Sequence, residues 1–286
     1  MNMTPIETPT PPSLRPIQRM AMRRDEQRTR ALELEALIED RLATRSSHYR
    51  CGTALFNDEF PRAGALNVLR VDSGVPALDA DSLINFTDEL QGGLPQRSVR
   101  VVDDERANQL RPAFAAAGWV CSELTLMGPR RVPDRPVDVS SVHEIGVDEL
   151  REAPEATLRR VHRDLDSAEQ LAVANVLPAD GVGLRCYAAT VGSEVAAYAV
   201  ARVHGEVAKL VELDSFARSH GHGLGRAIVW GAVTMLRASG VRVTVVEAEE
   251  NGWAKSTFHR LGFDDIGHTH RFVRPWADAS APPPAI

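Results

Sequence analysis

Three glycines stand at alternate positions in the segment His220-Gly-His-Gly-Leu-Gly-Arg226, directly before a predicted helix over 224–238. Without Cβ atoms at Gly221, Gly223 and Gly225, the backbone can approach a bound anion closely. The unpaired N–H groups of the first helical turn would point at that anion, assisted by the helix dipole. The spacing therefore indicates a phosphate-binding turn, with a diphosphate as the natural ligand. A glycine-rich turn that binds no ligand is the alternative.

Two other phosphate motifs do not match this segment. A Walker A loop requires a Gly-Lys pair before Ser or Thr, and the chain contains no Gly-Lys pair. The dinucleotide fingerprint Gly-x-Gly-x-x-Gly fails because, counted from Gly221, Arg226 occupies the third glycine position. The sequence thus disfavours P-loop and nicotinamide chemistry.

A second set of residues follows the glycines at fixed spacing: Asn251, Ala254, Phe258, Gly262 and Phe263. Together with His220-x-x-Gly223-x-Gly225, this pattern resembles the GNAT superfamily of acyl-CoA-dependent N-acyltransferases. The resemblance is strongest over 208–263. The sequence of the glycine turn is also similar to that of tandem members of the mycothiol-synthase type. Two positions depart from the family pattern. His220 replaces Arg or Gln, and Phe258 replaces the Tyr that many members use as general acid.

The resemblance implies a donor, a reaction and a role for each residue. Acetyl-CoA would pass its acetyl group directly to the amine of a small molecule in a ternary complex. The strand that holds Leu213, Asp214 and Ser215 would offer backbone groups to the pantetheine arm and polarise the thioester carbonyl. The pyrophosphate would lie on the turn of His220, Gly221, His222, Gly223, Leu224, Gly225 and Arg226. Asn251 would hydrogen-bond the pantetheine region, and Phe258 would pack against it.

The amine must lose a proton, so a base is needed within reach. Glu212 matches the position at which many family members carry a base glutamate, and it is our choice; a solvated or salt-bridged strand residue is the alternative. Regular strand alternation would place Leu210, Glu212 and Asp214 on one face. Asp214, Glu247 and His259 are reserve candidates.

Shifting the chain by 144 residues reveals an internal repeat without gaps. Apolar positions coincide, as does the corner Phe114-x-x-x-Gly-Trp119 with Phe258-x-x-x-Gly-Phe263. The same shift places Ala77, Asp79 and Asp81 on the three glycines of the turn and Ala107 on Asn251. Carboxylates repel a diphosphate, whereas Asp79 or Asp81 can cap the following helix. We therefore expect the first copy to bind no acyl-CoA, and either to support the second copy or to form a wall of its acceptor site.

The predicted fold class is α/β, with two tandem GNAT-like domains, each a mixed central sheet flanked by helices. We expect a disordered tail over 1–24, a degenerate domain over 25–135, the acetyltransferase domain over 136–276 and a second tail over 277–286. Helices are expected near 24–45, 81–90, 105–117, 147–162, 224–238 and 252–261. Strands are expected near 49–56, 65–71, 98–102, 120–127, 184–191, 194–203, 208–216, 241–247 and 266–273.

Composition excludes several classes of protein. A net charge of −6 disfavours binding to the negatively charged backbone of nucleic acid. No apolar run is long enough to span a bilayer. The three cysteines form no CxxC pair, so we expect reduced thiols and a cytoplasmic location. No metal is expected: His268 and His270 share a strand face, but the sequence suggests no third ligand, and an exposed edge strand is the simpler interpretation.

Three questions stay open at this stage. A catalytically silent acyl-CoA-binding module is an alternative to the enzyme, because Phe258 lacks the hydroxyl of a general acid. Acetylation of a protein amine is a further alternative, and a homodimer is possible. The acceptor depends on residues that no motif fixes.

Overall fold

A computed structural model describes residues 22–72, 74, 78–150, 176–192, 194–215 and 223–275. Its helices are α1 Arg24–Leu42, α2 Ala80–Leu90, α3 Asp104–Ala116, α6 Leu224–Ala238 and α7 Trp253–Arg260. Its strands are β1 Arg45–Tyr49, β2 Gly52–Phe56, β3 Val68–Val71, β4 Gln96–Val101, β5 Val120–Pro129, β6 Val142–Ile145, β7 Gly183–Val191, β8 Glu194–His204, β9 Val207–Ser215, β10 Val243–Glu249 and β11 Phe263–Pro275. Most of the helix expected at 147–162 and both expected tails fall largely outside the described residues.

Most predicted elements are present, with two differences. The single strand expected at 49–56 is a hairpin, because the chain turns at Arg50 and Cys51 and β1 pairs with β2. β6, at Val142–Ile145, was not expected from the sequence; it is short and pairs with β7. Pro112 lies inside α3, which nevertheless runs unbroken from Asp104 to Ala116.

Within the described residues the strands form one eleven-stranded mixed sheet in the order β1-β2-β3-β4-β11-β5-β10-β9-β8-β7-β6. The two halves therefore share a sheet, and they exchange their last strands. β5 leaves the first half to pair with β10, while β11 returns to pair with β4. β5 and β11 lie antiparallel to each other at the centre of the sheet.

The exchange is reciprocal and follows the internal repeat. With the 144-residue shift, β5 coincides with β11 and β4 coincides with β10. The aromatic corner is also duplicated: Phe114 and Trp119 have ring centroids 5.0 Å apart, and those of Phe258 and Phe263 are 5.6 Å apart. The glycine of each corner has a positive φ, +79° at Gly118 and +86° at Gly262. The structure thus supports a duplicated unit.

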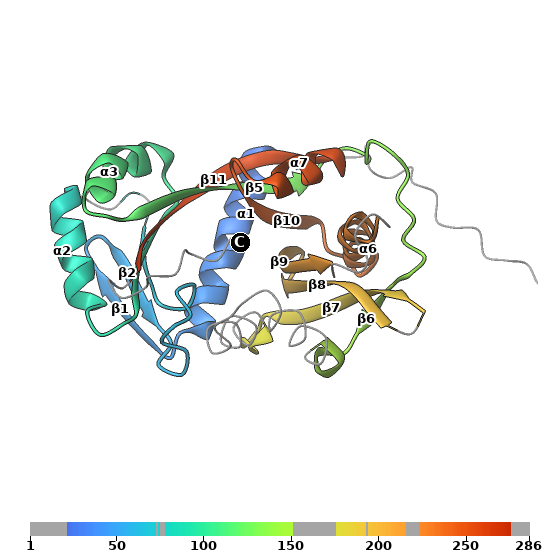
Figure 1. The fold of residues 1–286 in the computed structure, drawn as a ribbon, viewed down its shortest axis with the longest axis horizontal. Helices are drawn as coiled ribbons and strands as arrows, with labels where there is room; N and C mark the ends of the chain where they lie inside the picture. Colours follow the sequence, from blue (N-terminus) through green and yellow to red (C-terminus); the bar gives the residue numbers. More distant parts are fainter. Residues whose placement is uncertain are drawn as a thin grey trace, which may run out of the picture.

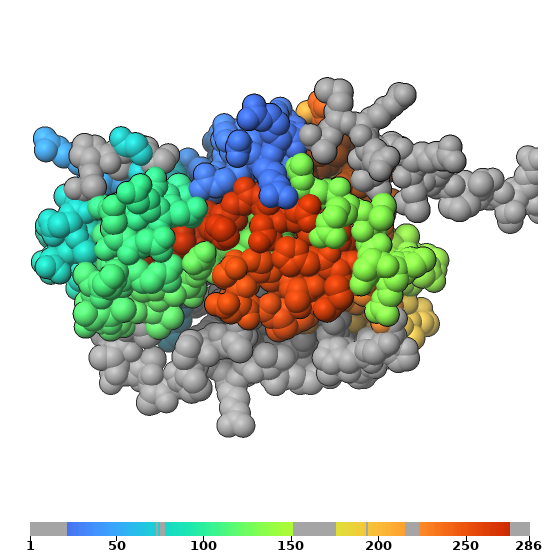
Figure 2. All heavy atoms as spheres, turned by 90° about the horizontal axis from the view of Figure 1, so that it is seen from above, coloured from blue at the N-terminus to red at the C-terminus, as the bar shows by residue number. Residues whose placement is uncertain are grey.

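Helices cover both faces of the sheet. α2 and α3 cover the first half, and α6 and α7 cover the same face of the second half. α1 crosses the opposite face at the centre, where Ala31 packs against Leu126, Val243 and Val245. Seen from above, α1, α3 and the segment of α7 and β11 lie side by side (Figure 2).

Charged side chains are buried beneath α1, where the halves meet. Lys209 of β9 forms ion pairs with Glu35 of α1 and, at 3.2 Å, with Glu247 of β10. Arg100 of β4 reaches Glu39 of α1 at 3.0 Å. Burial alone would lower the pKa of Lys209, but the charges of Glu247 and Glu35 outweigh it and raise that pKa. The network joins α1 to strands of both halves.

Candidate functional site

The parallel strands β9 and β10 separate toward their carboxyl ends. Their pairing runs from Val207 opposite Val243 to Lys209 opposite Val245 and stops there. β9 nevertheless continues to Ser215 and β10 to Glu249, each paired only with its outer neighbour. The two strands thus separate into a wedge at their carboxyl ends. Ligands of open α/β folds commonly bind at the carboxyl ends of the strands.

Helix α6 follows β9 in the chain, and its first residue, Leu224, belongs to the same core cluster as Leu213 of β9 and Ala248 of β10. Its N-cap is Gly223, whose φ of +74° lies in the left-handed region that favours glycine. No side chain among the described residues caps the helix start. The amides of Arg226 and Ala227 bond back to the carbonyl of Gly223, which leaves those of Leu224 and Gly225 without a helical acceptor. An anion is a natural partner for such amides.

A bulge in β9 determines which of its side chains lie on the face of the sheet covered by α6 and which lie on the opposite face. Val200 of β8 pairs with Glu212, but Ala201 pairs with Leu210, so Val211 is the additional residue. Leu210 and Leu213 therefore face α6, whereas Glu212 and Asp214 share the opposite face with Val200. The expectation that Leu210 and Glu212 share a face is wrong, because regular alternation does not survive a bulge.

Glu212 and Asp214 lie close to a buried tyrosine on their face. Asp214 pairs with Tyr198 across β8 and β9. Burial raises the pKa of Tyr198, and the negative charges of Glu212 and Asp214 raise it further. The geometry thus gathers two carboxylates beside the wedge, on the face opposite α6.

The two predicted contacts downstream have different surroundings. Asn251 lies in the turn after β10 and is exposed, at the carboxyl end of the strand that forms one side of the wedge. Phe258 is only 6% exposed and packs on Phe263 in the core. Its ring offers little surface to a ligand and has no proton to donate.

Arg226 does not present a free side chain to a phosphate. Its guanidinium is largely buried and donates to Asp134 at 2.5 Å. His220, Gly221 and His222 lie outside the described residues, as does the side chain of Ser215. The predicted turn is therefore represented here by Gly223, Leu224, Gly225 and the backbone of Arg226.

The corresponding place in the first half is built differently. β3 and β4 pair up to Val71 and Val101, the last residues of both strands, so no wedge opens. Asp79 caps α2 by accepting a hydrogen bond from the amide of Ser82 at 2.8 Å. This confirms the expected cap, and the hydrogen bonds from Ser82 lower the pKa of Asp79. The carboxylate takes the place that an anion could hold at α6.

His268 and His270 lie at the centre of the sheet and not on an exposed edge. β11 is flanked by β4 and β5, and His270 is 2% exposed with its Nε2 2.8 Å from Asp104. The expectation of an exposed edge strand is therefore wrong. The carboxylates of Glu123 and Glu250 lie near His268. Strand pairing over long sequence distances brings them together, so no local sequence signal could have found them.

No family model and no curated protein matches the sequence. Solved structures do match. A GCN5-related N-acetyltransferase from Kribbella flavida shares 15% identity, covering 89% of this chain and 97% of its own, with a TM-score of 0.62. A tandem GNAT protein from the clavulanic acid biosynthesis pathway shares 16% over the same coverage, with a TM-score of 0.54. A conserved protein of unknown function from Staphylococcus epidermidis has a TM-score of 0.61 at 12% identity, over 82% of this chain and 94% of its own.

These likenesses establish the fold: the chain has the architecture of tandem GNAT proteins, as the glycine turn and the internal repeat predicted. At such low sequence identities, these likenesses show the fold but do not identify a substrate. In the described part of the chain, no helix is long and apolar enough to cross a membrane.

Proposed function

We propose that the second half binds an acyl-CoA, with acetyl-CoA as the donor, and transfers the acetyl group to the amine of a small molecule. The observation that carries this proposal is the wedge between β9 and β10, with the uncapped start of α6 at its edge. The wedge accommodates a narrow chain such as pantetheine between two strands. The amides of Leu224 and Gly225 then meet the pyrophosphate.

The reaction is a direct transfer in a ternary complex. The amine nitrogen attacks the thioester carbonyl, and a backbone N–H of Leu213 or Ser215 stabilises the oxyanion. Glu212 accepts the proton that the amine loses, directly or through one water. The carbon–sulfur bond then breaks, and coenzyme A leaves with the electron pair. A thiol pKa of about 8.5 makes this thiolate a fair leaving group without help from Phe258.

A silent acyl-CoA-binding module is the second candidate. The specific observation in its favour is Phe258, which lies in the core and has no hydroxyl. Release of free thiol from acetyl-CoA across a panel of small amines separates the two candidates. Turnover with any amine supports the enzyme, whereas tight binding without turnover on every amine supports the silent module.

The binding site is tested with Gly223→Asp, measured by calorimetric titration of the full chain with acetyl-CoA. The new carboxylate would repel the pyrophosphate at the start of the helix, at the position that Asp79 occupies in the first half. We expect binding to weaken at least about 100-fold, which is about 2.7 kcal/mol.

Gly118→Asp is the matched control, because Gly118 has a similar φ of +79° and open space around it. Both substitutions strain the backbone by about 1 kcal/mol. Gly118→Asp should therefore reduce the melting temperature and leave acetyl-CoA binding unchanged. Equal affinity of the Gly223→Asp variant and the wild type would refute the site.

A further inference from the structure

Two carboxylates oppose each other where the strands of the two halves meet. Glu123 lies on β5, and Glu250 follows β10; the amide of Glu250 donates to the carbonyl of Glu123 at 3.0 Å. This hydrogen bond continues the β5–β10 pairing and holds both side chains on the face of α7. Like charges opposite one another in a sheet are destabilising unless a cation lies between them.

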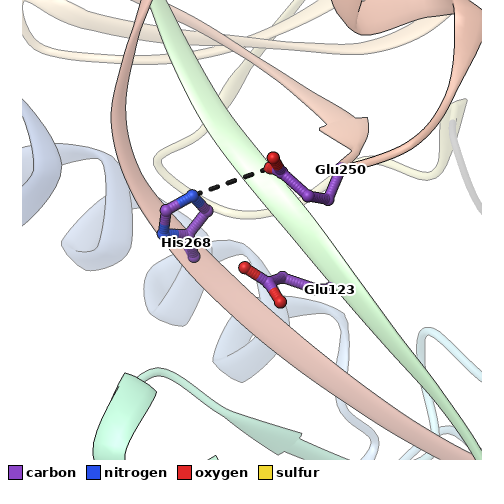
Figure 3. Close-up of side chains that lie close together, drawn as sticks. All are labelled: Glu123, Glu250 and His268. Carbon is purple, nitrogen blue, oxygen red and sulfur yellow. Dashed lines mark ion pairs between the residues drawn. The ribbon is translucent and has the colours of Figure 1, made fainter.

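His268 approaches the same two carboxylates from β11. A register shift between Asp265 and Gly267 makes Ile266 an extra residue in this strand. Ile266 and Gly267 both face α1 in consequence, so His268 turns toward α3 and α7. Its Nε2 lies 3.7 Å from Oε2 of Glu250, and the three side chains converge (Figure 3).

The other nitrogen of His268 also faces a carboxylate. Nδ1 lies 3.9 Å from Oδ2 of Asp104, which accepts through its other oxygen from His270. At 3.9 Å this is no hydrogen bond, but it places one carboxylate beside Nδ1 while the two glutamates lie beside Nε2, the order of groups found around a metal-binding histidine and its supporting partner.

The neighbouring cations do not neutralise the cluster. Arg111 reaches Glu123 only at 3.4 Å, longer than the roughly 2.7–2.9 Å of a strong charged hydrogen bond. Lys255 contacts Glu250 at 2.6 Å but also Asp265 at 3.0 Å, so it keeps a partner if Glu250 binds elsewhere. Arg111 and Lys255 supply two positive formal charges against the four carboxylates Asp104, Glu123, Glu250 and Asp265, so the cations alone leave a formal balance of −2.

We propose that this cluster binds one divalent transition-metal ion, with Zn²⁺ as the best match. One donor atom each from Glu123, Glu250 and His268 would coordinate it, and these atoms lie within 4.8 Å of one another. An imidazole nitrogen favours Zn²⁺ over Mg²⁺ or Ca²⁺, which prefer oxygen alone. Three protein ligands leave a fourth position for water. The side chains are about one-third exposed, so the ion can enter from solvent.

The ion would fasten the turn after β10 to the two exchanged strands. Glu250 immediately precedes Asn251, so binding would order the turn that carries this residue. The inference does not depend on acetyl transfer, because it concerns the binding of the metal itself. Its test can fail while acetyl-CoA still binds, and acetyl-CoA binding can fail while the metal binds.

The test is calorimetric titration of the reduced full chain with Zn²⁺ alone, together with the melting temperature at each metal concentration. We expect one Zn²⁺ per chain and a melting temperature that rises with metal. His268→Ala and Glu250→Gln should each weaken binding at least about tenfold. Glu250→Gln preserves the shape of the side chain, so loss of folding does not obscure the result.

Two controls exclude general surface binding. Glu249→Gln changes the neighbouring residue, which is exposed on the opposite face, and His143→Ala changes an exposed histidine of β6. Both variants should bind Zn²⁺ as the wild type does. The proposal is overturned if the wild type binds no Zn²⁺, if Glu249→Gln and Glu250→Gln bind equally, or if alkylation of the cysteines alone abolishes binding.

Discussion

Glu212 and Leu213 are neighbours in the chain, and the bulge at Val211 assigns them to opposite layers. Leu213 packs toward the core beneath α6, whereas Glu212 faces away from it beside Tyr198. The proposed base and the backbone proposed to bind the thioester are thus separate features of one strand. A substitution at Glu212 can therefore change proton transfer without disturbing the wedge.

We predict that Glu212→Gln lowers kcat for acetyl transfer roughly 10²-fold to 10⁴-fold, the usual contribution of a general base. The KM for acetyl-CoA should not change, because the carboxylate does not contact the cofactor in this proposal. Steady-state kinetics against an amine acceptor measures both constants. Glu206→Gln, in the turn before β9, is the control and should leave both unchanged. A kcat retained by Glu212→Gln would assign the base to another residue.

At the scale of elements, α2 and α6 begin at equivalent positions and satisfy their first amides in different ways. Asp79 caps α2, and the strands beside it pair to their ends. Gly223 leaves α6 uncapped beside strands that separate. The first copy thus obtains from its own side chain the stabilisation that the second copy would obtain from a ligand.

The cap predicts a measurable difference between two neighbouring carboxylates. Asp79→Ala should lower the free energy of unfolding by about 1 kcal/mol, since the amide of Ser82 loses its acceptor. Asp81→Ala, in the first turn of the same helix, removes only a favourable dipole contact and should cost less. Urea denaturation of both variants measures the difference. Equal losses would show that the cap contributes nothing beyond its charge.

At the scale of the whole molecule, the exchange of β5 and β11 makes each half depend on the other. β4 and β10 each have an exchanged strand as neighbour, and α1 crosses the join with its buried charges. The boundary proposed near residue 135 therefore separates the two repeats in the sequence. It does not divide the sheet, which is continuous between the two halves.

We predict that fragments 1–135 and 136–286 do not fold separately, because each alone exposes the strand edge that its missing partner covers. Mixed together, they should associate and recover a cooperative thermal transition. Circular dichroism during heating, with each fragment alone and with the mixture, tests this. A fragment that melts cooperatively by itself at the temperature of the intact chain would contradict it.

The buried network beneath α1 predicts the response of stability to acid. Burial would raise the pKa of Glu247, but Lys209 and Arg271 outweigh it and lower that pKa to about 2, from an ordinary 4.5. A lowered pKa in the folded state stabilises the fold above the ordinary value, and this contribution disappears as the pH falls from about 4.5 to 2. Glu247→Gln should therefore be less stable than the wild type at pH 7, and the difference should shrink toward pH 2. Denaturant unfolding across this range measures it.

The sequence by itself determined the local features of this protein: the glycine turn before α6, the aromatic corners, the repeat and the capping aspartate. Each depends on residues a few positions apart, or on identical spacing in two copies. These features can therefore be predicted from the sequence alone. Only the tertiary structure decided the exchange of strands, the face of Glu212 and the meeting of His268 with Glu123 and Glu250. Strand pairing over long distances and single-residue bulges fix these features, and neither leaves a periodic trace in the chain.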